Sequence, residues 1–185
     1  TFLPFYFFTF LLFRTFVATM TYEELWHRLT SVYDAGEAKA IVRLVLDVRF
    51  GLSATDVYCG KVTELSANHQ TELEKIMLRL EKGEPVQYVL GVADFYGREF
   101  HVEPGVLIPR PETAELCEWI LESKGERLRV GELCSGMWRE VRDYSMLDIG
   151  TGSGCIAITL ALEMPEAKDS AWDISNDALR IAEGN

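Results

Sequence analysis

Cysteine and histidine are scarce in this 185-residue sequence, and neither forms a recognisable binding pattern. The four cysteines include no Cys-x-x-Cys pair and no neighbouring histidine, whereas a zinc site needs clustered ligands. Such sparse cysteines also argue against a secreted disulfide framework, so we expect a cytoplasmic protein without a metal site. Cys117 and Cys155 lie in apolar helical stretches and are expected to be buried, inert thiols. His27, His69 and His101 are scattered along the chain, and we assign them no chemistry.

Positive charge is also in short supply. Lys and Arg number 18 against 29 Asp and Glu, which gives a net charge of −11, and no run of basic residues occurs. Because such a surface repels phosphate backbones, we expect no direct contact with nucleic acid. Hydrophobic residues make up 48% and charged residues 25%, as in a folded soluble protein. The length suits one ordinary domain, or a small domain and part of another.

An apolar run near the start, residues 2–13, has a composition unlike the rest of the chain. It is shorter than the roughly 20 residues that cross a bilayer, and Pro4 interrupts it. It also lacks the basic start and the clean cleavage site of a signal peptide. Thr21 and Glu24, by contrast, have the spacing of a helix capping box directly after Met20. We therefore expect residues 1–19 to be non-native upstream translation, in preference to a signal peptide or a membrane span.

Helical periodicity begins at this capping box and ends near Gly83. Ile41, Leu44, Val45 and Val48 repeat with the spacing of one helix face. A second such stretch follows a helix-capping serine, Ser66, and consists of Leu73, Ile76, Met77 and Leu80. Nothing in this region indicates catalysis. It is interpreted as a helical bundle that packs on itself or binds a partner.

Two features follow Gly83. Residues 92–102 contain two aromatic-rich runs around Gly97, which predicts a β-hairpin. Further along, Pro109 and Pro111 flank Arg110, fix an extended path and orient the arginine. Pro111 also suits the first turn of a helix. Composition leaves two interpretations of Arg110 open, a rigid linker between domains and part of a site.

A glycine-rich loop, Gly150-Thr151-Gly152-Ser153-Gly154, lies between a short apolar run at residues 146–149 and a helical stretch at residues 155–163. Strand, glycine turn and helix open an α/β nucleotide-binding unit. The spacing is Gly-x-Gly-x-Gly and not the dinucleotide pattern Gly-x-Gly-x-x-Gly, because the position of that pattern's third glycine is Cys155. Asp148, two residues before the loop, favours a cationic ligand such as the sulfonium of S-adenosylmethionine over a pyrophosphate.

A second acidic residue supports this interpretation. Residues 171–174 resemble the end of a second strand, and Asp173 lies about 20 residues beyond the loop, where a carboxylate accepts hydrogen bonds from ribose hydroxyls. Ser175 can cap the helix that begins at Asn176. The alternative is that Asp148 and Asp173 are simply turn and cap residues.

The sequence resembles the release-factor glutamine methyltransferases, also called HemK. Three stretches carry the resemblance: Glu84-Pro85-Val86-Gln87-Tyr88, then Gly91 with Phe95-Tyr96-Gly97, and Gly105-Val106-Leu107-Ile108-Pro109-Arg110-Pro111-Glu112-Thr113. In that family, the positions that match Gly150 to Gly154 and Asp173 bind S-adenosylmethionine. We accordingly expect the cofactor site to comprise Asp148, Gly150, Thr151, Gly152, Ser153, Gly154 and Asp173. We expect Phe100, Arg110 and Thr113 to contribute to a substrate pocket.

The fold that the resemblance implies is of the α/β class. Residues 20–83 would form a helical substrate-recognition domain, residues 84–110 a hairpin and linker, and residues 111–185 the truncated start of a Rossmann-like methyltransferase domain. The implied reaction moves a methyl group from S-adenosylmethionine to the glutamine of the Gly-Gly-Gln motif in class 1 peptide chain release factors. We expect a monomer that does not associate with membranes.

One part of the family pattern is missing from these residues. The family holds the substrate amide with an Asn-Pro-Pro-Tyr motif, and no Asn-Pro pair occurs here, so the catalytic motif would lie beyond Asn185. We expect this chain alone to be inactive, since positioning is the main source of rate in such chemistry. Two other classes stay open, a nucleic-acid amino-methyltransferase and a non-catalytic fragment that binds a partner. The charge of −11 disfavours the first, and measured binding of S-adenosylmethionine would exclude the second.

Overall fold

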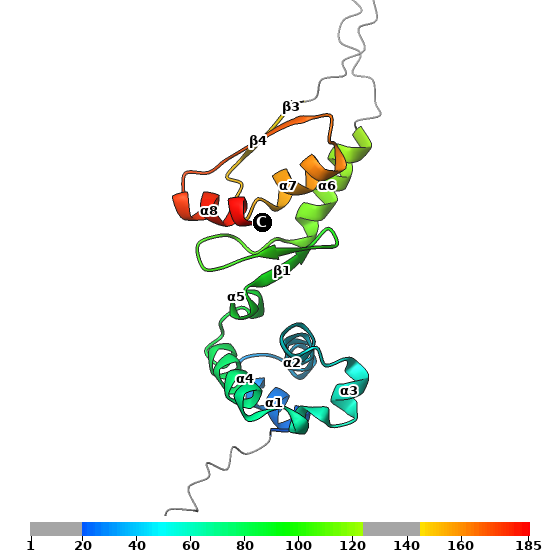
Figure 1. Ribbon diagram of the computed structural model, residues 1–185, viewed down its shortest axis with the longest axis vertical. Coiled ribbons are helices and arrows are strands. Elements are labelled where there is room, and N and C mark those ends of the chain that lie inside the picture. The colour runs from blue at the N-terminus through cyan, green and yellow to red at the C-terminus, as the bar shows by residue number, and fades with distance from the viewer. Residues whose placement is uncertain (1–19, 124–144) are drawn as a thin grey trace, which may run out of the picture. The chain divides into compact units, whose positions relative to one another are not determined.

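A computed structural model describes residues 20–123 and 145–185 of the chain. Its contacts divide the chain into two compact units, with the division between Leu90 and Gly91 (Figure 1). We call them the helical unit and the α/β unit and treat each by itself. The expectation for residues 1–19 lies outside the described residues.

The helical unit is built from short and medium helices whose first turns are capped by side chains. Thr21 and Glu24 form the predicted capping box, with the Thr21 N–H donating to Glu24 at 2.8 Å. Ser66 caps its helix as predicted, and its hydroxyl accepts from the His69 N–H. These bonds satisfy N–H groups that have no partner inside the helix. The elements are α1 (Tyr22–Leu29), α2 (Ala35–Phe50), α3 (Ala54–Tyr58), the 3-10 helix η2 (Lys61–Glu64), α4 (Ala67–Leu80) and α5 (Val86–Leu90).

The core of this unit follows the predicted periodicity in α4 and departs from it in α2. The four predicted apolar residues of α4 are all buried. In α2, Ile41 and Val45 are buried, but Leu44 and Val48 are partly in solvent. The buried stripe of α2 instead includes Leu46 and Val42, because this helix packs mainly against α1 and also contacts α3 and α5. The buried face of α2 therefore differs from the predicted face by part of a helical turn.

The α/β unit begins with the predicted hairpin. Strands β1 (Val92–Phe95) and β2 (Arg98–His101) pair antiparallel around a turn at Tyr96 and Gly97. Both turn residues have positive φ, 53° and 71°, which is the geometry that matches the twist of a two-residue hairpin. Helix α6 (Pro111–Ser123) follows and starts at the predicted proline.

A strand–helix–strand unit completes the described chain. Strand β3 (Ser145–Ile149) leads into α7 (Cys155–Glu163), and β4 (Lys168–Trp172) returns parallel to β3, with Ile149 opposite Trp172. Helix α8 (Asn176–Gly184) comes last, capped by Ser175 as predicted. Helix α7 packs on one face of the strand pair and α6 packs beside α7 (Figure 1). On the other face Leu147, Ile149 and Trp172 are exposed.

The hairpin belongs to the core of the α/β unit. Phe95 and Phe100 meet edge to face and pack in one buried cluster with Cys117 and Cys155. Arg98 joins the hairpin to the end of α7 through Glu163 at 2.6 Å. Residues 84–110 were predicted to form one hairpin and linker, and the contacts assign residues 84–90 to the helical unit and residues 91–110 to the α/β unit.

Both core cysteines are buried, as predicted. Loss of water around the thiol raises the pKa of Cys117 to about 11, and burial also raises the pKa of Cys155. Thiols with raised pKa values are poor nucleophiles at neutral pH, so these two side chains serve to fill the core.

Within residues 20–123 and 145–185, no helix is both long and apolar enough to cross a membrane. No group of three or more His, Cys, Asp or Glu side chains in the same residues could hold a metal ion.

The two leucines of α2 provide a matched test of this packing. Leu46 is fully buried and Leu44 is 40% exposed on the same helix. Leu46→Ala should lower the free energy of unfolding by about 2–5 kcal/mol, because it leaves a cavity in the core. Leu44→Ala should lower it by under about 1 kcal/mol. Urea denaturation followed by far-UV circular dichroism measures both, and equal losses would contradict the assigned core face.

Candidate functional site

The glycine loop lies where the parallel strands end. It leaves β3 after Ile149 and turns at once toward β4, so that the N–H groups of Gly150 and Thr151 donate to the Trp172 carbonyl at 2.7 and 3.1 Å. The Gly154 N–H donates to the Thr151 carbonyl at 2.8 Å, which closes the turn before α7. The loop is thus fixed by its own backbone and by the last residue of β4.

Three glycines give the loop its path. Gly150, Gly152 and Gly154 have φ values of 80°, 57° and 79°, a region that other residues rarely adopt. A side chain at Gly150 or Gly152 would meet nothing within 4 Å, so the backbone there faces open space. At Gly154 a Cβ would lie 2.9 Å from Ile158 and 3.1 Å from the Ala182 Cβ. The first two positions therefore leave room for a ligand, and the third allows α8 to approach the loop.

The two predicted carboxylates meet this loop. Asp148 accepts a hydrogen bond from the Thr151 hydroxyl at 2.8 Å. Asp173, just after β4, accepts from the Gly152 N–H and from the Ser175 N–H, both at 2.9 Å. The Ser175 bond and the Gly152 bond hold the pKa of Asp173 below its ordinary value, so this carboxylate is ionised at neutral pH.

These bonds show that both carboxylates have turn and cap roles. These bonds leave the carboxylate of Asp173 with free lone pairs, because each of its oxygens accepts one hydrogen bond from the backbone and can accept another. The structure thus brings together residues that lie 25 positions apart in the sequence, Asp148 and Asp173, on one short loop. Binding of a ligand by these residues stays a prediction.

The three residues predicted for a substrate pocket lie apart from the loop's hydrogen bonds. The Phe100 ring is only 2% exposed and packs the hairpin against α6 and α7, so its contact with a substrate stays a prediction. Arg110 is exposed directly before α6, and its carbonyl accepts from the Thr113 N–H at 3.0 Å. Among the described residues, no hydrogen bond or ion pair engages the Arg110 guanidinium, which therefore stays available.

Known proteins match this chain at several levels. A family model described as the PrmC N-terminal domain matches residues 23–91. The release factor glutamine methyltransferase of Bacteroides thetaiotaomicron is 48% identical over 157 residues, which cover 85% of this chain and 51% of that relative. The chain belongs to the release factor glutamine methyltransferase family.

Other members of the family agree with this assignment. The protein of the same name from Flavobacterium psychrophilum is 37% identical over 157 residues, covering 85% of this chain and 51% of the relative. That of Koribacter versatilis is 48% identical over 122 residues, covering 66% of this chain and 39% of the relative. The chain spans about half the length of the curated relatives it matches first. The family's N-terminal domain, residues 23–91, ends where the helical unit ends.

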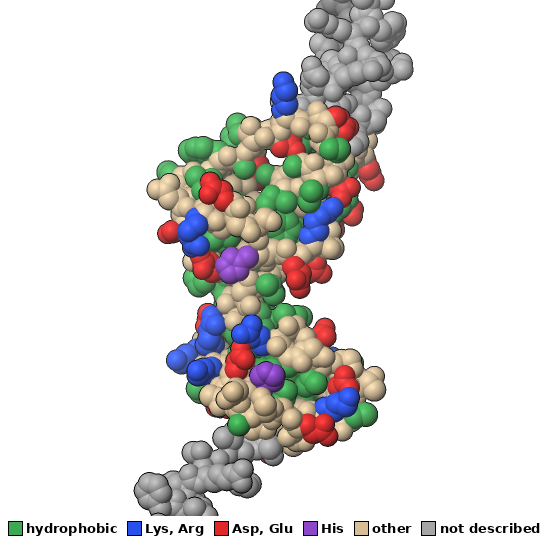
Figure 2. Space-filling model, in the orientation of Figure 1, with side chains coloured by type: hydrophobic (Ala, Val, Ile, Leu, Met, Phe, Trp, Pro, Cys, Tyr) green, Lys and Arg blue, Asp and Glu red, His purple; other side chains and the backbone are tan. Residues whose placement is uncertain are grey.

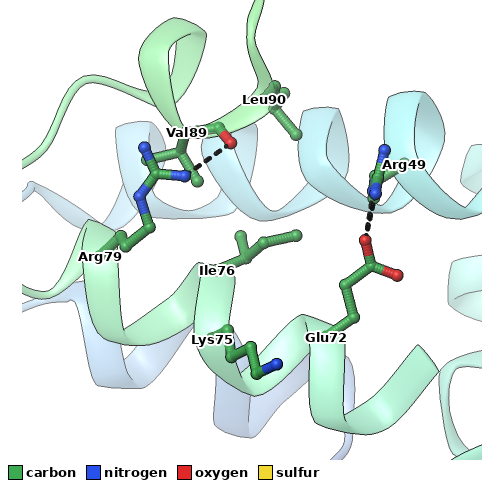
Figure 3. A pocket seen from close by; sticks show the side chains of 7 residues that line it. All are labelled: Arg49, Glu72, Lys75, Ile76, Arg79, Val89 and Leu90. Atoms are coloured by element: carbon green, nitrogen blue, oxygen red, sulfur yellow. Dashed lines mark hydrogen bonds and ion pairs between the residues drawn. The ribbon is translucent and has the colours of Figure 1, made fainter. Parts of the chain in front are cut away.

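This N-terminal domain contains a pocket of about 270 Å³ between α2, α4 and α5 (Figure 3). Arg49 and Arg79 line it, and several Lys and Arg side chains of this unit lie close together on the face shown in Figure 2. Arg49 binds Glu72 at 2.5 Å, and Arg79 binds Glu84 and the Val89 carbonyl. These bonds join α2 and α5 to α4. We therefore interpret the arginines around the pocket as structural side chains and not as ligand-binding ones.

Sequence reasoning missed two contributors to the glycine loop. The Trp172 carbonyl could have been found, since parallel strands joined by one helix end side by side. The side chain of Asn185 could not, because its partners are 32 and 84 residues away in the sequence.

The crowding at Gly154 leads to a stability prediction with a matched control. Gly150→Ala should cost about 1–2 kcal/mol for the left-handed backbone alone, since its Cβ meets open space. Gly154→Ala should cost at least about 2 kcal/mol, because the new methyl group also presses on Ala182 and Ile158. Thermal and urea unfolding of the two variants give the comparison. A Gly154→Ala protein as stable as Gly150→Ala would refute the close approach of α8.

Proposed function

We propose that the glycine loop and its two carboxylates bind S-adenosylmethionine. The main support is the hydrogen bond from the Gly152 N–H to Asp173, because it places an ionised carboxylate next to loop backbone that has no side chain at Gly152. Open space at Gly150 and Gly152 fits a ligand that lies against the loop. The donor set fits as well, because carboxylates suit ribose hydroxyls and a cation, whereas a pyrophosphate would be repelled. The relatives are named as methyltransferases, which supports the same methyl donor.

Each residue of the site has a distinct task in this proposal. Asp173 would accept hydrogen bonds from the ribose hydroxyls, because its two bonds to the backbone leave other lone pairs of the carboxylate free. Asp148 would favour the cationic part of the ligand, and its bond to Thr151 holds it in place. Gly150 to Gly154 would supply the surface against which the ligand lies, with Thr151 and Ser153 buried beneath. When bound, S-adenosylmethionine supplies an electrophilic methyl group on its sulfonium.

The acceptor that we propose is the side-chain amide nitrogen of a glutamine, in the Gly-Gly-Gln motif of class 1 peptide chain release factors. This choice of acceptor rests on the name of the relatives, release factor glutamine methyltransferase, and on the resemblance of residues 105–113 to that family. The guanidinium of Arg110 is exposed and suited to hold a substrate carbonyl or carboxylate near the helix start. An amide nitrogen is a weak nucleophile, so the enzyme's contribution is to hold it in line.

The fold and the cellular setting follow from the same proposal. We infer that β3, α7 and β4 are the start of a Rossmann-like methyltransferase sheet, supported by their parallel pairing. We infer that the helical domain predicted at residues 20–83 recognises the substrate protein, and that the enzyme acts in the cytoplasm as a monomer. No Asn-Pro pair occurs in these 185 residues, so we infer that they do not catalyse transfer alone.

Binding of the cofactor tests the central proposal directly. Asp173→Ala should weaken binding of S-adenosylmethionine about tenfold, because a charged acceptor for the ribose is lost. Asp177→Ala removes an exposed carboxylate four residues away and is the matched control. Isothermal titration calorimetry of the chain and both variants measures the dissociation constants. Equal affinity of the chain and Asp173→Ala would remove Asp173 from the ribose role.

Substitution of Arg110 distinguishes the two interpretations of this residue, a rigid linker and part of a substrate site. In a form extended to the length of the curated relatives, Arg110→Ala should lower methylation of a purified class 1 release factor at unchanged affinity for S-adenosylmethionine. Stability should change by no more than about 0.5 kcal/mol, as for an exposed side chain. Arg110→Lys keeps the charge without the planar fork and should restore only part of the rate. A rate unchanged in Arg110→Ala would favour the linker interpretation.

A further inference from the structure

The side chain of Asn185 joins two segments that are distant in the sequence. Its Nδ2 group donates to the Ser153 carbonyl at 3.0 Å and to the His101 carbonyl at 3.1 Å. Its Oδ1 atom accepts from the His101 N–H at 2.6 Å. One amide group thus bonds to the glycine loop and to the last residue of β2.

The contact with β2 uses an edge of the hairpin that β1 leaves open. The hairpin ladder closes through the bond from the Val102 N–H to the Gly91 carbonyl, so the N–H and carbonyl of His101 point away from β1. The amide of Asn185 satisfies both groups, as a peptide group of a third strand would. Unpaired backbone groups of this kind attract any available partner, and here that partner is Asn185, the residue directly after α8.

The contact with the loop restrains the peptide bond between Ser153 and Gly154 from both ends. Its carbonyl accepts from Asn185, and its N–H donates to the Thr151 carbonyl at 2.8 Å. The N–H groups of Gly150 and Thr151 donate to Trp172, and that of Gly152 donates to Asp173, the residue after β4. Asn185 therefore supplies a restraint on the loop that does not come from the two parallel strands.

Two more residues of α8 act on the same two segments. Ala182 lies against Gly154, closely enough that a Cβ there would be 3.1 Å away. Arg180 forms an ion pair with Glu103, two residues beyond His101. The segment from His101 leads on to Arg110, so α8 touches both the loop and the start of the stretch that carries this arginine.

We propose that Asn185 is a positioning residue of the cofactor site, which sets the end of the glycine loop against β2 before a ligand arrives. This inference rests on the proposed binding of S-adenosylmethionine. A loop that is already ordered does not lose further conformational freedom on binding, so its affinity is higher. A purely structural asparagine would stabilise the unit and leave the affinity of the folded protein unchanged.

The test compares Asn185→Ala with Asn68→Ala, an exposed asparagine in the helical unit. Calorimetry at a temperature where both variants are folded should show S-adenosylmethionine binding about tenfold weaker in Asn185→Ala and unchanged in Asn68→Ala. Hydrogen exchange without ligand should be faster at the Gly154 amide of Asn185→Ala, with α7 unchanged. Faster exchange through all of α7 would mean a structural role and would overturn the proposal.

A second variant tests the donor bonds alone. Asn185→Asp keeps an acceptor for the His101 N–H but sets a carboxylate against the carbonyls of His101 and Ser153. Its binding should be at least as weak as that of Asn185→Ala, and affinity equal to the parent chain would overturn the positioning role. If the parent chain binds no S-adenosylmethionine, the proposed function fails, whereas the exchange measurement still decides whether Asn185 restrains the loop.

Discussion

The parallel pairing of β3 with β4 is the constraint on which the candidate site depends. It sets Ile149 opposite Trp172, so both strands end at one edge. The chain leaving β3 then meets the Trp172 carbonyl, which accepts two loop N–H groups. The chain leaving β4 meets the loop in turn, and Asp173 accepts from Gly152. Gly152 and Asp173 are 21 positions apart in the sequence, and without this register they would not meet in a common site.

Features that depend on neighbouring residues could be predicted from the sequence. The caps at Thr21, Ser66 and Ser175 each involve a side chain and a backbone N–H three residues away, and the hairpin depends on a two-residue turn. Such interactions are encoded locally, so residue type and spacing are enough to find them. The strand–glycine–helix order was visible for the same reason.

Features that depend on tertiary packing were missed or misplaced. The helical unit was expected to end near Gly83, but Arg79 holds the next turn of chain through Glu84 and Val89, so the unit ends at Leu90. The hairpin was taken as part of a linker because nothing in its sequence shows that Phe95 and Phe100 complete the core of the α/β unit. The bonds of Asn185 cross 32 and 84 residues, and no local pattern specifies them.

The restraints on the loop are spread over both of its sides, and this distribution has a physical consequence. On one side the loop is bonded to the carboxyl end of β4, and on the other to α8 and, through Asn185, to β2. Among the described residues, α7 covers one face of the β3–β4 pair, and Leu147 and Ile149 are exposed on the other. The bonds of Asn185 tie the loop to β2, and β2 belongs to a core formed by the hairpin, α6 and α7. The position of the loop therefore depends on the packing of that core as well as on the register of the two parallel strands.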